Sequence, residues 1–257
     1  MNLSDENFSA SGYLNSGFEG ISCTFTEMEV LWQTRHNRLI RAKRYGRWWM
    51  LKSLKPEYAG QIFYQQMMRK ELELLMKLQH PYVVQAVGLE DVKGYGICIV
   101  MEYVDGMVLD EWLSERRGKE DRLRLVKELL DAVNYIHSKG VVHRDLKPGN
   151  MLVTRNGTDI KLIDLGLGDN DHQAILKQPA GTFPYISPEQ KEDSLPDVRN
   201  DVYSLGMVLQ ELLPEWKFRS IIRKCLLPKD KRFQNVASLI RAMKRMESRN
   251  RRMVWRG

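Results

Sequence analysis

Two short segments in the second half of the chain constrain its fold more than any other feature. Residues 141–150 read VVHRDLKPGN, and residues 162–166 read LIDLG. Each segment joins apolar, strand-like residues to charged or amide side chains, so we expect a loop and a strand end that face one cleft. The side chains that carry chemistry are two carboxylates, a lysine and an amide: Asp145, Lys147, Asn150 and Asp164.

This set of groups suits the transfer of a phosphoryl group. The Asp145 carboxylate can orient an attacking hydroxyl, and Lys147 can offset the charge on the moving phosphate. Asn150 and Asp164 supply hard oxygen atoms, which are the ligands that Mg²⁺ prefers. Either segment alone can occur by chance, and Asp145 and Asp164 could then be two ordinary turn carboxylates. Both segments in this order and at this spacing point to a site.

The chain resembles the protein kinase family, of the Ser/Thr type, from about Phe25 to Met243. HRDLKPGN agrees with the family's H-R-D-L-K-P-x-N at every fixed position, and Lys147 is the form typical of Ser/Thr kinases. DLG at 164–166 replaces the family's D-F-G, and SPE at 187–189 replaces A-P-E. The resemblance implies an α+β fold with two lobes, a small N-lobe with an antiparallel sheet and a mainly helical C-lobe. It also implies that ATP and Mg²⁺ are the cofactors.

The resemblance assigns two charged residues to the first lobe. Lys52, in WWMLKSL, resembles the lysine that grips the α- and β-phosphates of ATP. Glu71 lies nine residues before His80, the family's spacing for the helix glutamate that pairs with this lysine. Glu73 is the fallback partner, but at two residues further on it is expected on another face of the same helix.

The resemblance also outlines an adenine pocket. IVMEYVDG at 99–106 resembles the linker between the lobes, with Met101 at the back of the pocket. The backbone C=O of Glu102 and N–H of Val104 would hydrogen-bond the adenine edge, and Leu152 would pack beneath the ring. Taken alone, the same run reads as a buried strand.

Three further assignments fall in the second lobe. GTFPYISPE resembles the substrate-docking segment of Ser/Thr kinases, with Thr182 as its expected hydroxyl. Asp201, in DVYSLG, resembles the residue that anchors the catalytic loop. Arg232, in LLPKDKRF, resembles the arginine that pairs with the glutamate of SPE, here Glu189.

The family's glycine-rich loop is degenerate in this chain. G-x-G-x-x-G-x-V falls on WQTRHNRL, so the three glycines become Trp32, Thr34 and Asn37, and the valine becomes Leu39. Glycine suits this loop because the backbone must approach phosphate closely and adopt unusual dihedral angles. In addition, the family's adenine-facing alanine is Met50, which can lie along the ring or fill the pocket.

Composition narrows the class of protein. With 43% hydrophobic and 28% charged residues, the chain is globular. Its three cysteines form no CxxC pair, so neither a disulfide framework nor a zinc site is indicated. No apolar run reaches the roughly 18–20 residues that span a bilayer, and no signal-peptide pattern begins the chain, so a cytoplasmic location is expected.

The net charge of +7 is concentrated in the first strands and the last helix. A basic C-terminal tail can contact a polyanion, whereas a solvated helix face is the simpler interpretation. We expect a flexible N-terminal segment over residues 1–24, an N-lobe over 25–104, a C-lobe over 105–245 and a basic tail over 246–257.

Within these parts, hydrophobic periodicity predicts the individual elements. Three short strands fill residues 25–52, with breaks near TRHN and RYG, and two more precede and follow the turn DVKGYG. Helices with apolar residues along one face are predicted over 61–79 and 121–140, and an apolar helix is predicted over 200–213. GNMLVT and DIKLIDLG are predicted to be strands around an NG turn.

Three functions are compatible with this sequence. The first is a Ser/Thr protein kinase that uses Mg-ATP to phosphorylate protein hydroxyl groups. The second is a pseudokinase, a binding or scaffold module of the same fold with weak or no nucleotide binding, which the missing glycines and Met50 favour. The third is a polyanion-binding protein, whose affinity would fall steeply with salt.

Overall fold

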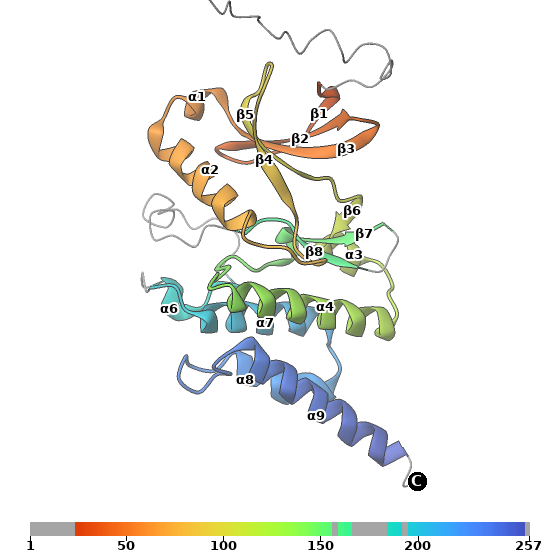
Figure 1. Ribbon diagram of the computed structural model, residues 1–257. Coiled ribbons are helices and arrows are strands. Elements are labelled where there is room, and N and C mark those ends of the chain that lie inside the picture. Colours follow the sequence, from red (N-terminus) through yellow and green to blue (C-terminus); the bar gives the residue numbers. More distant parts are fainter. Residues whose placement is uncertain (1–23, 156–158, 166–183, 192–194, 255–257) are drawn as a thin grey trace, which may run out of the picture.

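The computed structural model describes residues 24–155, 159–165, 184–191 and 195–254 (Figure 1). Its first part is a five-stranded antiparallel sheet in the order β1-β2-β3-β5-β4, accompanied by two helices. The elements of this part are β1 (Thr26–Gln33), β2 (Asn37–Arg44), β3 (Arg47–Leu54), α1 (Pro56–Ala59), α2 (Ile62–Leu75), β4 (Ala86–Val92) and β5 (Gly96–Glu102).

β1, β2 and β3 lie where three strands were predicted, within residues 25–52, and β3 extends two residues further. β2 and β3 are joined by Tyr45 and Gly46, whose φ angles of 52° and 71° are both positive. Two successive positive φ angles match the right-handed twist of a hairpin, and glycine adopts the second without a steric penalty. The sheet edge at β1 remains exposed along its whole length.

The second part is mainly helical and contains a small three-stranded sheet in the order β6-β7-β8. Figure 1 shows this small sheet between the five-stranded sheet and the adjacent helices α4 and α7. The elements are β6 (Gly106–Val108), α3 (Leu109–Ser114), α4 (Lys119–Ser138), η1 (Pro148–Asn150), β7 (Met151–Thr154), β8 (Ile160–Leu162), α6 (Pro188–Lys191), α7 (Val198–Leu212), η2 (Trp216–Phe218), α8 (Arg219–Cys225) and α9 (Val236–Val254). The architecture is therefore the expected α+β arrangement, with an antiparallel sheet first and helices after it.

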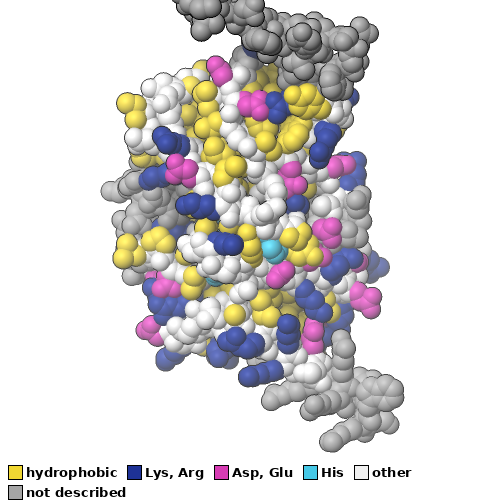
Figure 2. Space-filling model, in the orientation of Figure 1, with side chains coloured by type: hydrophobic (Ala, Val, Ile, Leu, Met, Phe, Trp, Pro, Cys, Tyr) yellow, Lys and Arg dark blue, Asp and Glu magenta, His cyan; other side chains and the backbone are white. Residues whose placement is uncertain are grey.

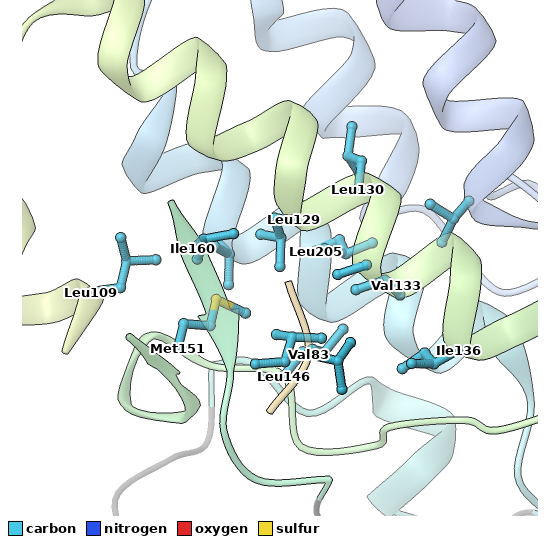
Figure 3. Close-up of a cluster of buried hydrophobic side chains, with 14 of the residues drawn as sticks. Val83, Leu109, Leu129, Leu130, Val133, Ile136, Leu146, Met151, Ile160 and Leu205 are labelled. Atoms are coloured by element: carbon cyan, nitrogen blue, oxygen red, sulfur yellow. The ribbon is translucent and has the colours of Figure 1, made fainter. Parts of the chain in front are cut away.

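The main hydrophobic core lies directly beneath the HRDLKPGN segment. One face of α4 carries Leu129, Val133 and Ile136, which lie opposite side chains from the small sheet in Figure 3. Leu146, inside that segment, and Met151, directly after it, are fully buried in the same cluster. Burying one such side chain contributes about 1.5–3 kcal/mol, so the segment is held in place by its own apolar residues.

Several helix boundaries differ from the predicted ones; α4, for example, spans Lys119–Ser138 and not 121–140. Two of the differences have a clear local cause. α2 ends at Leu75 and not at residue 79, because Met76 closes the helix with its N–H on the Leu72 carbonyl. α7 begins at Val198, two residues before the predicted start. There Asp197 accepts a hydrogen bond from Arg199 N–H, and Asn200 bonds back to the Asp197 backbone in a capping box.

The types of side chain on the surface differ between the sheet part and the helical part of the molecule. On the face in Figure 2, hydrophobic side chains gather over the five-stranded sheet, whereas Lys and Arg side chains are frequent over the helices below it. Within the described residues, no helix combines the length and the apolar character that crossing a membrane requires.

Candidate active site

Lys52, on β3, joins the two parts of the molecule. Its ammonium Nζ lies 2.6 Å from Glu71 Oε1 on α2 and 3.5 Å from Asp164 Oδ1, just after β8. Only 12% of the Lys52 side chain and 9% of the Glu71 side chain are exposed. Glu73, the fallback partner, instead pairs with Arg69 on the outer face of α2, at 3.1 Å.

Burial and charge act in opposite directions on these three groups. Burial alone would lower the pKa of Lys52, but the charges of Asp164 and Glu71 outweigh it, so the pKa is raised and the amine stays protonated. Burial raises the pKa of Glu71 even though Lys52 opposes it. Burial would raise the pKa of the Asp164 carboxyl, but the charge of Lys52, followed by that of Lys147, lowers it, so the carboxyl stays ionised.

The HRDLKPGN segment brings Asp145, Lys147 and Asn150 together. Lys147 Nζ lies 2.8 Å from Asp145 Oδ2, and the amide nitrogen of Asn150 donates to the same oxygen at 2.9 Å. The Asn150 nitrogen also donates to the Asp145 carbonyl at 2.9 Å. These bonds fix the orientation of the Asp145 carboxylate, which stays partly exposed and can accept a hydrogen bond from an incoming hydroxyl.

The hydrogen bonds of Asn150 indicate whether Asn150 and Asp164 could hold Mg²⁺. Because the Asn150 nitrogen donates to Asp145, the amide oxygen is directed away from that carboxylate, and it accepts no hydrogen bond from the residues that the structure describes. It can therefore act as a ligand. Asp164 supplies an ionised carboxylate. The described residues hold no group of three His, Cys, Asp or Glu side chains that could enclose a metal. A site with two protein oxygens suits Mg²⁺, which commonly keeps water and phosphate oxygens as its other ligands.

Asp201, on α7, anchors the segment from below. Its fully buried carboxylate accepts the backbone N–H groups of His143 and Arg144, both at 2.7 Å, and lies 2.7 Å from His137 Nε2. Arg144 has a φ of 66°, in the left-handed region that is costly for a residue with a side chain. The carboxylate therefore holds a strained backbone turn immediately before Asp145, as predicted for this aspartate.

Strand register places the predicted adenine-facing residues on one face of the sheet. Leu39 on β2 pairs with Lys52 on β3, and Met50 on β3 pairs with Met101 on β5. Directly paired residues share a face, and residues two apart on a strand share it too, so these four side chains line the face that carries Lys52. Leu152, on β7, is half-buried in the small sheet.

The linker between the two parts is fastened at Glu102. Its carboxylate pairs with Lys161 on β8 at 2.5 Å and accepts the Gln85 backbone N–H at 3.0 Å. Among the described residues, the backbone N–H of Val104 forms no hydrogen bond, so this donor is available to a ligand. Lys161 was not predicted as a site residue. Ile160 and Leu162 on either side of it are buried, so strand alternation places the Lys161 side chain on the opposite face of β8, where it reaches Glu102. This alternation is the sequence signal that could have found it.

The hairpin that replaces the glycine-rich loop is short and internally bonded. Thr34 N–H donates to the Asn37 carbonyl at 2.9 Å, and Asn37 N–H donates to Thr34 Oγ1 at 3.0 Å. Trp32 pairs with Leu39 across the hairpin, and 66% of its side chain is exposed. The threonine and asparagine thus form the turn through a side-chain bond that glycine cannot make.

The remaining assigned residues lie further from Lys52. Arg232 Nη1 lies 2.6 Å from Glu189 Oε1, which is the predicted pair, and only 1% of the arginine side chain is exposed. Gln190, next to this pair, donates to the Arg144 carbonyl at 2.6 Å and so supports the strained turn; no sequence pattern singled it out. Thr182 lies outside the described residues.

Comparisons with known proteins agree with this geometry. A family model described as "Protein kinase domain" matches residues 24–251. A protein of Streptomyces coelicolor, named as a probable serine/threonine-protein kinase, is 38% identical over 180 residues, which are 66% of this chain and 27% of that protein. PrkC, a serine/threonine-protein kinase of Bacillus subtilis, is 33% identical over 170 residues, 63% of this chain and 26% of its own length. The chain thus spans about a quarter of the length of these curated relatives.

A solved structure shares the fold at lower identity. The kinase domain of PknI from Mycobacterium tuberculosis superposes with a TM-score of 0.65 and 22% sequence identity. The alignment covers 87% of this chain and 97% of the PknI chain. The two chains therefore have the same arrangement of elements almost from end to end.

Proposed function

The chain belongs to the protein kinase family, and from that premise we propose that it is a Ser/Thr protein kinase, which transfers the γ-phosphate of ATP to serine and threonine hydroxyl groups of proteins. One observation carries the proposal. Lys52 lies within ion-pair distance of both Glu71 and Asp164. The cation proposed to bind phosphate and the carboxylate proposed to bind the metal are therefore neighbours, which supports the proposal.

Each residue of the site has a proposed role in this reaction. Asp145 orients the acceptor hydroxyl and takes up its proton, and Lys147 offsets charge on the phosphoryl group. Asn150 and Asp164 hold Mg²⁺, which when bound neutralises phosphate charge. Lys52, held by Glu71, binds the α- and β-phosphates. The acceptor is a protein in this proposal, because Lys147 and the Thr182 segment follow the Ser/Thr kinase pattern.

The proposed nucleotide site uses backbone and apolar groups. The Glu102 carbonyl and the Val104 N–H hydrogen-bond the adenine edge, and Met101 closes the back of the pocket. Leu39 and Met50 cover one face of the ring, and Leu152 covers the other. Met50 is partly buried against the main core, which supports a side chain lying along the pocket wall.

One assay tests the proposal. The protein is incubated with Mg-ATP and a generic basic substrate protein, and phosphate transfer is compared among wild type, Asp145→Ala and Lys52→Met. We expect transfer by the wild type and its loss in both variants. Absence of transfer by the wild type, together with no thermal shift on adding ATP, would exclude the kinase and leave a pseudokinase with a scaffold role.

The predicted polyanion contact of the C-terminal residues is separate from this proposal and stays a prediction. Its measurement is the salt dependence of binding to a polyanion such as heparin. A steep loss of affinity with rising salt is the expected signature of a phosphate- or sulfate-binding surface.

A further inference from the structure

A cluster of three aromatic rings joins the tip of the β1–β2 hairpin to the start of helix α2. The His36 ring lies 4.7 Å from the Tyr58 ring and 4.7 Å from the Tyr64 ring, and the two tyrosine rings are 4.8 Å apart. Tyr58 belongs to α1 and Tyr64 to the first turn of α2. We refer to His36, Tyr58 and Tyr64 as the aromatic clasp.

The backbone reinforces the same junction. The N–H of Lys55, which follows β3, donates to the His36 carbonyl at 2.7 Å. Arg38 Nη2 donates to the Leu54 carbonyl at 3.2 Å, on the same side of the hairpin. The hairpin tip is thus tied to the end of β3, the strand that carries Lys52, as well as to α1 and α2.

The His36 ring is built into the clasp as a neutral group. Burial, followed by the charges of Arg35 and Lys55, lowers the pKa of His36. Its Nε2 atom is buried and has no hydrogen-bond partner among the described residues. The contacts that the ring makes in the clasp are therefore those of its shape and its aromatic faces.

The clasp and the Lys52–Glu71 pair lie on one face of α2. Tyr64, Met68 and Glu71 are spaced by four and then three residues, which aligns them along one side of the helix. Tyr64 and Glu71 are two turns apart, or about 10 Å along the axis. A shift of α2 that separates Glu71 from Lys52 would therefore also move Tyr64 away from His36.

We propose that the aromatic clasp holds the β1–β2 hairpin over the phosphates of the nucleotide and couples its position to that of helix α2. In this chain, glycines are absent from the hairpin, and anchoring to α2 takes the place of close backbone approach to the phosphates. His36, Tyr58 and Tyr64 are positioning residues in this proposal, because they act through the hairpin backbone and through Glu71. The proposal rests on the function proposed above.

The test compares a small set of variants of the 257-residue chain. His36→Ala and Tyr64→Ala remove a ring from the clasp, and His36→Phe keeps the ring while removing the unpaired nitrogen. Ile62→Ala is the matched control, because Ile62 lies at the same end of α2 with 70% of its side chain exposed and no part in the clasp. The readouts are KM for ATP, kcat for phosphate transfer and amide hydrogen exchange without nucleotide.

We expect His36→Ala and Tyr64→Ala each to raise KM for ATP by roughly five- to tenfold, given the size of aromatic-pair energies, with a smaller change in kcat. His36→Phe and Ile62→Ala should stay within about twofold of wild type, since replacing an unpaired buried polar atom by an apolar one of similar shape is close to neutral. The double variant His36→Ala/Tyr64→Ala should be no worse than either single variant, because the rings act as a unit.

The results separate this proposal from the proposed function. Wild-type KM values in His36→Ala, or additive effects in the double variant, would overturn the clasp while leaving the kinase in place. If the wild type transfers no phosphate, the proposed function fails, and hydrogen exchange alone decides the clasp. Faster exchange at the Lys55 and Asn37 amides in His36→Ala, but not in His36→Phe, supports it, and unchanged exchange contradicts it.

Discussion

Lys52 holds a positive charge in a nearly closed environment, and Glu71 is the carboxylate nearest to it. Glu71→Gln keeps the size of the side chain but removes the charge, leaving Lys52 with Asp164 at 3.5 Å as its only close carboxylate within the described residues. Losing a charge-assisted hydrogen bond costs about 2 kcal/mol, so we expect kcat/KM for ATP to fall about thirtyfold. Steady-state kinetics at several ATP concentrations measure this change.

Glu73 offers a matched control for that variant. It lies on the same helix with an exposed side chain, and among the described residues its ion-pair partner is Arg69. Glu73→Gln should leave kcat/KM within about twofold of wild type, because exposed ion pairs contribute little. If Glu73→Gln were the more damaging of the two, the assignment of Glu71 to Lys52 would be wrong.

Thr34 stabilises the turn of the β1–β2 hairpin. Its hydroxyl accepts the Asn37 N–H at 3.0 Å and shapes the hairpin turn. Thr34→Gly restores the family's residue but removes this bond and makes the unfolded hairpin more flexible, so we expect weaker ATP binding, by roughly threefold. Thr34→Ser, which keeps the hydroxyl, should bind as wild type does. Tighter ATP binding by Thr34→Gly would mean that the missing glycine is a defect and not an adaptation.

Among the secondary-structure elements, helix α7 carries Asp201, which holds the HRDLKPGN segment. The start of α7 depends on Asp197. Arg199 and then Lys229 stabilise the ionised form and lower the pKa of the Asp197 carboxyl. Asp197→Ala removes the cap and should destabilise the fold by about 1 kcal/mol, whereas Asp197→Asn keeps a capping oxygen and should lose less. Thermal unfolding at pH 7 should rank wild type first, Asn second and Ala last.

The pH dependence of these variants follows from the sign of the shift. A carboxyl whose pKa is lowered by folding stabilises the native state above its unfolded pKa, near 4, and this contribution is lost as the pH falls toward the folded value. The difference in stability between wild type and Asp197→Asn should therefore be full at pH 7 and shrink below about pH 4. A difference that grows in acid would contradict the ion pair with Arg199.

Helices and strands were largely predictable where the hydrophobic periodicity is strong. They were less predictable where individual hydrogen bonds determine the residue at which an element begins or ends. β1 to β3 follow alternation and a turn that contains Gly46, and α4 follows its apolar face. The end of α2 at Leu75 and the start of α7 at Val198 depend on individual cap bonds, which have no period. The short helices α1 and α3, at Pro56–Ala59 and Leu109–Ser114, are too brief to show one.

The candidate site could be predicted in part for a related reason. Asp145, Asn150 and Asp164 lie in two segments whose residue order is itself the signal, whereas Lys52 and Glu71 were assigned by their resemblance to residues of the protein kinase family. The clasp could not be predicted in this way. The contacts of His36 with Tyr58 and Tyr64 depend on how the β1–β2 hairpin, β3 and α2 lie in the folded molecule. No local sequence pattern encodes such a contact.

At the scale of the whole molecule, the pair Glu189–Arg232 joins α6 to the chain before α9. Arg232 is almost fully buried and also donates to the carbonyls of Leu227 and Arg199, at 3.0 Å and 2.7 Å. Removing one partner of a buried pair leaves an uncompensated charge and costs about 3 kcal/mol. We expect Arg232→Met to lower the free energy of unfolding by about this amount in a urea titration.

A second variant distinguishes the charge from the packing. Glu189→Gln in the Arg232→Met background removes the unpaired carboxylate, so the double variant should be more stable than the sum of the two single losses predicts. Strictly additive losses would show that the two side chains stabilise the fold independently. Either substitution alone should leave the distance between Lys52 and Glu71 unaffected, because both lie in the other part of the molecule.

In the proposed function, both parts of the molecule serve one reaction, in which a phosphate moves from ATP to a protein hydroxyl. The most direct measurement is the phosphoamino-acid content of a basic acceptor protein after incubation with the wild type, or with Asp145→Ala, and radiolabelled Mg-ATP. The account predicts phosphoserine and phosphothreonine with the wild type and only background with Asp145→Ala. Label that is absent with the wild type, appears only on tyrosine, or is unchanged in Asp145→Ala would contradict it.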